Sequence, residues 1–166
     1  RAALLTGLMP ARNGAQPNHS KPRADIRKLP SYLQALGYEV VAFGKVAHYR
    51  HAVDYGFDHF AHDGFHADIA VEAALQWLRA RRSDRPLCLL IGTNWPHVPW
   101  PAAATADSAG AAVAFPGVDT PQTRTARQRY LAAVRLMDDE LGRVRATVTD
   151  VLGANTVFVH GSDQGA

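Results

Sequence analysis

Hydrophobic positions change period along the chain, and these changes predict alternating helices and strands. Apolar residues at helical spacing predict three helices, over residues 29–37, 67–82 and 120–148. Continuous apolar runs, as in buried parallel strands, predict three strands, over residues 38–43, 86–92 and 155–160. From residue 38 onward the order is strand, helix, strand, helix, strand. That order predicts an α/β fold, with a mostly parallel sheet, right-handed crossovers and helices on both faces.

Two further stretches have the composition of loops. Residues 10–28 contain three prolines among many polar residues, and residues 96–121 combine five prolines with a run of Ala, Gly and Ser. The second stretch is long for a connection, which makes it a candidate functional or insertion loop. The chain opens on residues 1–7, RAALLTG, which predict a short helix that ends at Gly7.

The composition narrows the classes of protein to which the chain could belong. The chain has 166 residues, of which 47% are hydrophobic and 20% charged, as expected of one globular domain or most of one. The net charge is +3 and the basic residues are scattered, so no basic strip indicates nucleic-acid binding. No apolar run has transmembrane length. The single cysteine, Cys88, lies inside an apolar run and is interpreted as a small core residue.

Polar side chains follow each predicted strand. Ligands of open α/β sheets bind beyond the carboxyl ends of the strands, so we expect these side chains to share one edge. Successive strand ends provide Lys45 and His48, then Asn94 and His97, and finally Asp163 and Gln164.

The chemistry of these groups predicts an anion site with a metal. Carboxylate and amide oxygens, as in Asp163 and Gln164, are ligands that suit Ca²⁺ or Mg²⁺. Lysine and histidine donors, as in Lys45, His48 and His97, suit a tetrahedral oxyanion such as sulfate or phosphate.

Each of these residues also has an ordinary structural interpretation. Taken alone, Lys45 is more often a residue of a solvated loop. His97 fits a rigid surface turn between prolines, and Asp163 fits a turn before glycine. A zinc cluster in the histidine-rich stretch 51–66, at His51, His59, His62 and His66, has no supporting ligand spacing. The joint pattern at three strand ends favours the anion site.

In five segments the chain resembles the sulfatase family of the alkaline-phosphatase-like superfamily. The first, RAALLTG, resembles the second half of the sulfatase signature, and the others follow in the family's order along nearly the whole chain. They are GYEVVAFGKVAH, DYGFDHF, NWPHVPW, and the long helix followed by TVFVHGSDQG. The two-residue gap between Lys45 and His48 resembles the iduronate-2-sulfatase branch. The resemblance implies a partial alkaline-phosphatase-like three-layer sandwich.

The resemblance assigns roles to individual residues. Arg1 matches the signature arginine that stabilises the formylglycine nucleophile. Lys45 and His48 match the pair that contacts the nucleophile and the sulfate. His97 matches the histidine that binds sulfate or assists the leaving group.

Two more positions match metal ligands of the family. Asp163 matches a carboxylate ligand of the divalent cation, and Gln164 stands where the family usually has Asn or His. The nucleophile would lie four residues before Arg1, outside the chain. We therefore expect residues 1–166 to be part of a sulfatase catalytic domain truncated at both ends, inactive by itself.

The implied function is hydrolysis of a sulfate ester, and the Lys45–His48 gap favours a sugar sulfate. The family implies a periplasmic or secreted protein. Two alternatives stay open: a phosphonate or phosphodiester hydrolase of the same superfamily, or a degenerate binding domain without catalysis. The glutamine at 164 motivates the second alternative.

Overall fold

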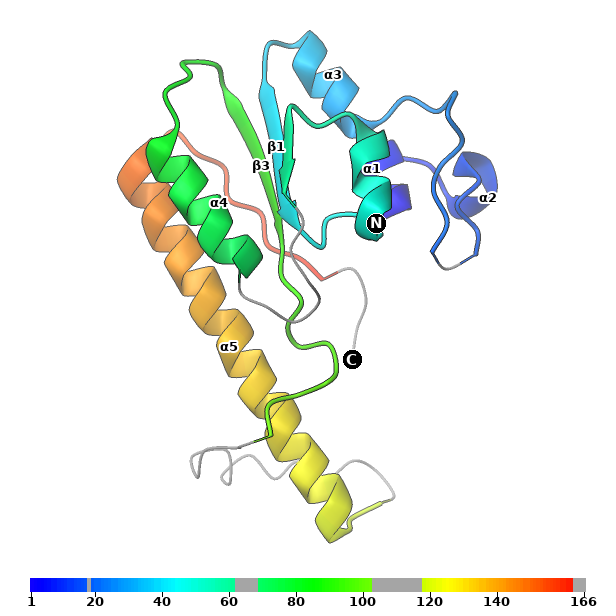
Figure 1. Ribbon diagram of the computed structural model, residues 1–166, viewed down its shortest axis with the longest axis vertical. Helices are drawn as coiled ribbons and strands as arrows, with labels where there is room; N and C mark the ends of the chain where they lie inside the picture. Colours follow the sequence, from blue (N-terminus) through cyan, green and yellow to red (C-terminus); the bar gives the residue numbers. More distant parts are fainter. Residues whose placement is uncertain (18, 62–68, 103–117, 163–166) are drawn as a thin grey trace.

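The computed structural model describes residues 1–17, 19–61, 69–102 and 118–162. Its centre is a parallel sheet of three strands in the order β2-β1-β3 (Figure 1). The strands are β1 (Glu39–Gly44), β2 (His59–Ala61) and β3 (Leu87–Gly92). The α/β fold with a parallel sheet, expected from the sequence, is confirmed.

Helices cover both faces of this sheet. α4 (Ile69–Ala80) and α5 (Pro121–Leu152) lie on one side (Figure 1). α1 (Ala2–Thr6) and α3 (Leu29–Ala35) lie on the other. The short helix α2 (Pro10–Asn13) follows α1, and the 3-10 helix η1 (Tyr49–Tyr55) follows β1. None of the helices in the described residues could span a membrane.

Alternation along β1 divides the core into two halves. Val41 and Phe43 face α4 and pack against Ala74. A second buried cluster, on the α1 side, contains Leu5 and Tyr55, with Leu90 of β3 packed against it. Successive side chains of a strand point to opposite faces, so the buried Val40 and Ala42 of β1 point away from the α4 side.

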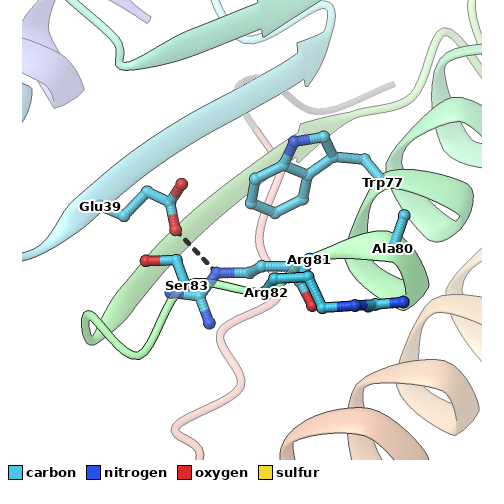
Figure 2. A pocket seen from close by; sticks show the side chains of 6 residues that line it. All are labelled: Glu39, Trp77, Ala80, Arg81, Arg82 and Ser83. Atoms are coloured by element: carbon cyan, nitrogen blue, oxygen red, sulfur yellow. Dashed lines mark hydrogen bonds and ion pairs between the residues drawn. The ribbon is translucent and has the colours of Figure 1, made fainter.

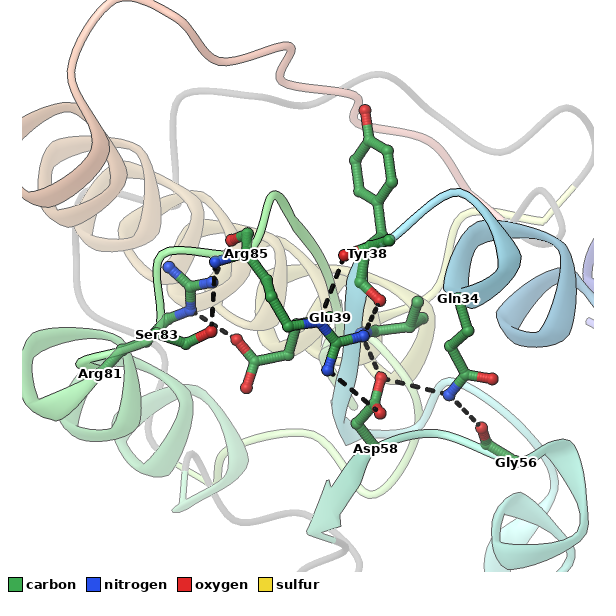
Figure 3. A network of polar contacts seen from close by, with 10 residues as sticks. Gln34, Tyr38, Glu39, Gly56, Asp58, Arg81, Ser83 and Arg85 are labelled. Carbon is green, nitrogen blue, oxygen red and sulfur yellow. Dashed lines mark hydrogen bonds and ion pairs between the residues drawn. The ribbon is translucent and has the colours of Figure 1, made fainter.

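An ion-pair network joins the amino-terminal ends of all three strands (Figure 3). The Asp58 carboxylate accepts hydrogen bonds from the Val40 main-chain N–H at 2.7 Å and from Gln34 Nε2 at 3.1 Å. Arg85 Nη1 lies 3.7 Å from the other Asp58 oxygen, and Arg81 Nε donates to Glu39 at 2.7 Å. The network therefore stabilises the edge opposite the one where the sequence predicts a site.

One predicted strand is absent. Residues 155–162 form no strand, and the side chains of Val157 and Val159 are 89% and 85% exposed. The prediction rested on the apolar run alone, but a strand exists only when a neighbour completes its hydrogen-bond ladder. The structure also contains three elements that the periodicity did not predict: the three-residue strand β2, the one-turn helix α2 and the 3-10 helix η1.

Candidate functional site

Arg1 stands directly before the first turn of α1, where it is the N-cap residue. The turn that follows is fixed by Asn13, whose side chain is buried. Asn13 Nδ2 donates to the Leu8 carbonyl at 2.9 Å and to Thr6 Oγ1 at 3.2 Å, and Asn13 Oδ1 accepts from the Ala15 N–H at 2.8 Å. This amide therefore connects α1, α2 and the segment after them. Because Arg1 directly precedes α1, these bonds also help to fix its position.

Two glycines bring the carboxyl ends of β1 and β3 into direct contact. Gly44 and Gly92 are paired in the register of the sheet. The Lys45 N–H donates to the Gly92 carbonyl at 2.8 Å. A Cβ on Gly92 would lie 2.4 Å from the carbonyl carbon of Lys45, so no side chain fits there. This contact fixes where Lys45 leaves the sheet and where the segment containing His48 begins.

Arg1 and His48 line one pocket of about 140 Å³. Its wall comes from three segments: the start of α1, residues 15–20, and residues 48–55. The complete lining is Arg1, Ala2, Ala15, Pro17, His19, Ser20, His48 and Tyr55. One guanidinium and two imidazoles therefore surround a small hollow with no carboxylate in its described lining. This composition suits an anion.

The rings of His19 and His48 are in contact inside this pocket. Their centroids lie 4.0 Å apart at an interplanar angle of 67°, which is an edge-to-face arrangement. Partial burial lowers the pKa of His48, and Coulombic interactions with His19, Arg1, His51 and Lys45 lower it further. Both effects favour the neutral form of His48.

Burial also raises the pKa of Tyr55, and the nearby Asp54 carboxylate adds to this effect. The phenol consequently keeps its proton and lines the pocket as a neutral group. Asp54 itself forms an ion pair with Lys21 at 2.9 Å. That pair connects the segment after residue 20 with η1.

His97 lies beyond the carboxyl end of β3, in a loop with cis peptide bonds before Pro96 and Pro99. Its Nδ1 is 2.6 Å from the Val98 carbonyl, and its N–H donates to the Asn94 carbonyl at 2.9 Å. His97 is at the predicted edge, but neither His97 nor Lys45 is part of the described lining of the pocket that Arg1 and His48 share.

A buried glutamate anchors the beginning of that loop. Thr93 Oγ1 donates to the carboxylate of Glu140, which is only 4% exposed on α5. The same Thr93 oxygen accepts from the Trp95 N–H at 3.2 Å. Glu140 therefore helps to position the loop of His97.

The predicted metal ligands Asp163 and Gln164 lie outside the described residues. Within the described parts of the chain, no group of three or more His, Cys, Asp or Glu side chains could hold a metal ion. His51 and His59 are separated: His51 Nε2 lies 3.1 Å from the His19 carbonyl, whereas His59 stacks on Trp77 on the α4 side. His62 and His66 lie outside the described residues.

A second hollow, of about 190 Å³, lies at the opposite edge of the sheet (Figure 2). Arg81 crosses it and forms a salt bridge with Glu39, with side chains that are 11% and 18% exposed. The salt bridge offsets the charge of Arg81, and the hollow borders the ion-pair network at the strand starts.

The sequence did not single out His19, Asn13 or Glu140. The pair Asn13-Gly14 is a turn signal that indicates a helix end at this point. Nothing in local periodicity relates His19 to His48, 29 positions later. Their contact depends on the segment of His19 and Lys21, which is joined to η1 through His51 and Asp54.

Comparison with known proteins gives the family. The family model described as Sulfatase matches residues 1–166. The chain belongs to the sulfatase family. The sequence resemblance is thereby confirmed at the level of the family.

Two sulfatases are similar in sequence. The ulvan-active sulfatase of Formosa agariphila is 26% identical over 179 residues, covering 99% of this chain and 34% of the relative. The N-acetylglucosamine-6-O-sulfatase of Bacteroides thetaiotaomicron is 29% identical over 126 residues, covering 60% of this chain and 22% of the relative. The chain thus spans about a third or less of the length of these curated relatives.

Solved structures agree with the sulfatase fold. One, from work on glycosaminoglycan metabolism by Bacteroides thetaiotaomicron, has a TM-score of 0.69 at 16% identity and covers 90% of this chain and 45% of that chain. Another, solved with its substrate D-glucosamine-2-N,6-O-disulfate, has a TM-score of 0.62 at 16% identity, covering 90% and 52%. At this identity the likeness shows the fold, which is the alkaline-phosphatase-like α/β fold expected from the sequence.

Proposed function

We propose that this chain provides one side of the active site of a sulfatase that hydrolyses a sulfate ester of a sugar. The single observation that carries the proposal is the pocket shared by Arg1 and His48, a hollow rich in cationic donors in a chain of the sulfatase family. The sugar is proposed because the relatives are named for ulvan and for N-acetylglucosamine 6-O-sulfate. The iduronate-2-sulfatase-like branch stays a prediction from the spacing of Lys45 and His48.

Hydrolysis breaks the bond between sulfur and the alcohol oxygen and forms a new sulfur–oxygen bond. Negative charge develops on the oxygens around sulfur and on the departing alcohol oxygen. Arg1 would stabilise the formylglycine nucleophile, and Lys45 would neutralise the sulfate oxygens. His48 would donate a hydrogen bond once the bound anion favours its protonated form. His97 would give a proton to the departing alcohol oxygen.

Two further groups belong to the proposal. The donor chemistry of Asp163 and Gln164 fits Ca²⁺ or Mg²⁺, and these residues would hold the ion, which when bound supplies positive charge beside the sulfate. The attacking oxygen would come from a hydrated formylglycine four residues before Arg1, as the family resemblance implies.

The test is sulfate release by the full-length protein, measured by ion chromatography with N-acetylglucosamine 6-sulfate and other sulfated sugars. N-acetylglucosamine 6-phosphate in parallel identifies a phosphoryl-transfer enzyme. We expect Lys45→Ala and His97→Ala to lower kcat/KM by about 10²–10³-fold. Arg145→Ala removes one exposed positive charge of α5 and should leave kcat/KM unchanged.

Three outcomes would contradict the proposal. Faster release of phosphate than of sulfate would identify the related phosphoryl-transfer chemistry. Absence of turnover with every ester tested would identify a degenerate binding domain. Unchanged turnover in both Lys45→Ala and His97→Ala would show that the assigned residues are not the site.

A further inference from the structure

His19 is held in an unusual backbone conformation next to the pocket. Its φ is +64°, and it is the only non-glycine residue of the described chain with a positive φ. Residues other than glycine adopt this left-handed region rarely, and they are found there mostly where surrounding contacts hold them. We therefore expect specific contacts to hold His19 in this conformation.

Contacts on both sides hold His19 in place. His51 Nε2 lies 3.1 Å from the His19 carbonyl, and the neighbouring Lys21 forms its ion pair with Asp54 at 2.9 Å. The Ser20 N–H donates to the Pro17 carbonyl at 3.3 Å, which closes a turn around residue 19. The segment is therefore attached to η1 at two points. These attachments give the ring of His19 a defined position.

The ring of His19 meets the ring of His48 edge to face, with centroids 4.0 Å apart. Such a contact restricts rotation of the partner ring about its Cβ–Cγ bond, because turning the plane would drive one ring into the other. His48 comes four residues after the end of β1, beyond the hydrogen bonds that fix the strand. Its ring therefore depends on neighbouring side chains for its orientation.

We infer that His19 is a positioning residue of the sulfatase site, whose ring holds the His48 imidazole in the orientation that binds the sulfate group. The inference rests on the proposed function and adds a residue that neither the family resemblance nor the strand-end pattern assigns. His19 lines the same pocket as Arg1 and His48, so its ring also forms part of the wall around the anion.

The pKa of His48 provides a second test of the role of His19. The groups that act on it are His19, Arg1, His51 and Lys45, and all of them are cationic or become so on protonation. Loss of the His19 ring removes one of these positive neighbours and increases access of water. Both changes raise the pKa of His48 toward its ordinary value, whereas a distant structural change would leave it alone.

The experiment compares three variants of the full-length protein. His19→Gly removes the ring and accepts a positive φ, so the segment keeps its backbone path. His19→Phe keeps an aromatic ring for the edge-to-face contact without its nitrogens. Arg145→Ala removes an exposed positive charge on α5 and leaves every contact of His19 in place, which makes it the control. Circular dichroism establishes that each variant is folded.

We expect His19→Gly to lower kcat/KM by about tenfold or more, because a misplaced His48 ring binds the sulfate group less well in the substrate complex and in the transition state. His19→Phe should retain kcat/KM within about threefold, and Arg145→Ala should match the unmodified protein. An NMR titration of the His48 ring should show a higher pKa in both His19 variants. Three results would overturn the inference: unchanged kcat/KM in His19→Gly, an equal loss in His19→Phe, or an equal loss in Arg145→Ala.

Titration with inorganic sulfate separates this inference from the proposed function. Even if the unmodified protein turns over no ester, the ring signals of His48 should shift on addition of sulfate. His19→Gly should then require a higher sulfate concentration for the same shift. Equal affinity in the two proteins would refute the role of His19, and lack of hydrolysis together with a normal sulfate response would refute only the proposed enzyme activity.

Discussion

Gly44 and Gly92 approach each other so closely that a Cβ on Gly44 would lie 2.3 Å from the Gly92 carbonyl oxygen. The two residues end neighbouring parallel strands, and the Lys45 N–H bonds to the same Gly92 oxygen. Main-chain atoms form this junction, so it has little room to relax. It determines where the residues after each strand begin, and therefore where Lys45 and His97 are located.

Gly92→Ala should destabilise the protein by about 2–4 kcal/mol, in the range of strong overpacking and strain. The added Cβ would meet the main chain of Lys45 and Val46 at 2.4–2.8 Å. Gly142→Ala is the matched control, because nothing lies within 4 Å of its Cβ on α5, and it should stabilise the helix by up to about 1 kcal/mol. Urea unfolding of both variants tests this prediction, and equal midpoints would contradict it.

Asn13→Ala should cost about 2–3 kcal/mol and lower activity as well. The variant leaves the Leu8 carbonyl and the Ala15 N–H without their side-chain partner in a buried position. It also loosens the turn that fixes α1, which begins at Arg1. The unfolding temperature Tm and kcat/KM should therefore both be lower than in the unmodified protein. A stability loss with unchanged kcat/KM would show that Asn13 does not position Arg1.

Local pattern predicted most of the scaffold. The periodicity located α4, α5, β1 and β3 to within a few residues because each buries a face of regular spacing. It also predicted the helix at the start of the chain and its end at Gly7, whose φ is +67°. These are features that a few neighbouring residues determine by themselves.

Features that depend on distant partners were not predicted. The three residues of β2 become a strand only through pairing with Val41, Ala42 and Phe43. The apolar run at 155–160 has strand composition and yet joins no ladder in this structure. At the site, the order of strands predicted one shared edge, but the contact of His19 with His48 depends on how a polar segment packs against η1.

Asp58→Asn should destabilise the protein by about 2 kcal/mol at neutral pH, because a charged acceptor at the strand starts is lost. Burial acts to raise the pKa of Asp58, but hydrogen bonds from the Val40 N–H and Gln34 and the charge of Arg85 outweigh it, so the pKa is lowered. A carboxyl with a lowered pKa adds stability above its unfolded value of 3.8, and that stability is lost as the pH falls below it.

The difference between the unmodified protein and Asp58→Asn should therefore be full at pH 7 and shrink below about pH 4. Urea midpoints at pH 7, 5 and 3 measure it. Asp84→Asn, which changes an exposed carboxyl in the turn before β3, is the control and should show little difference at any pH. A constant difference for Asp58→Asn across this range would show that the Asp58 charge is not what stabilises the strand starts.

Acidification between pH 7.5 and 5 should destabilise the protein through His48. Partial burial and the surrounding positive groups His19, Arg1, His51 and Lys45 lower its pKa below 6.5, so the unfolded chain takes up the proton first. Stability is therefore full above pH 6.5 and falls as the pH decreases through 6.5 toward the folded-state pKa of His48. His48→Gln cannot take up this proton, and its urea midpoint should fall less over the same range.

Inorganic sulfate at saturating concentration should reduce the acid sensitivity of the unmodified protein, because the anion favours protonated His48 in the folded state. Identical pH profiles for the two proteins, with and without sulfate, would show that the pocket does not hold His48 toward its neutral form.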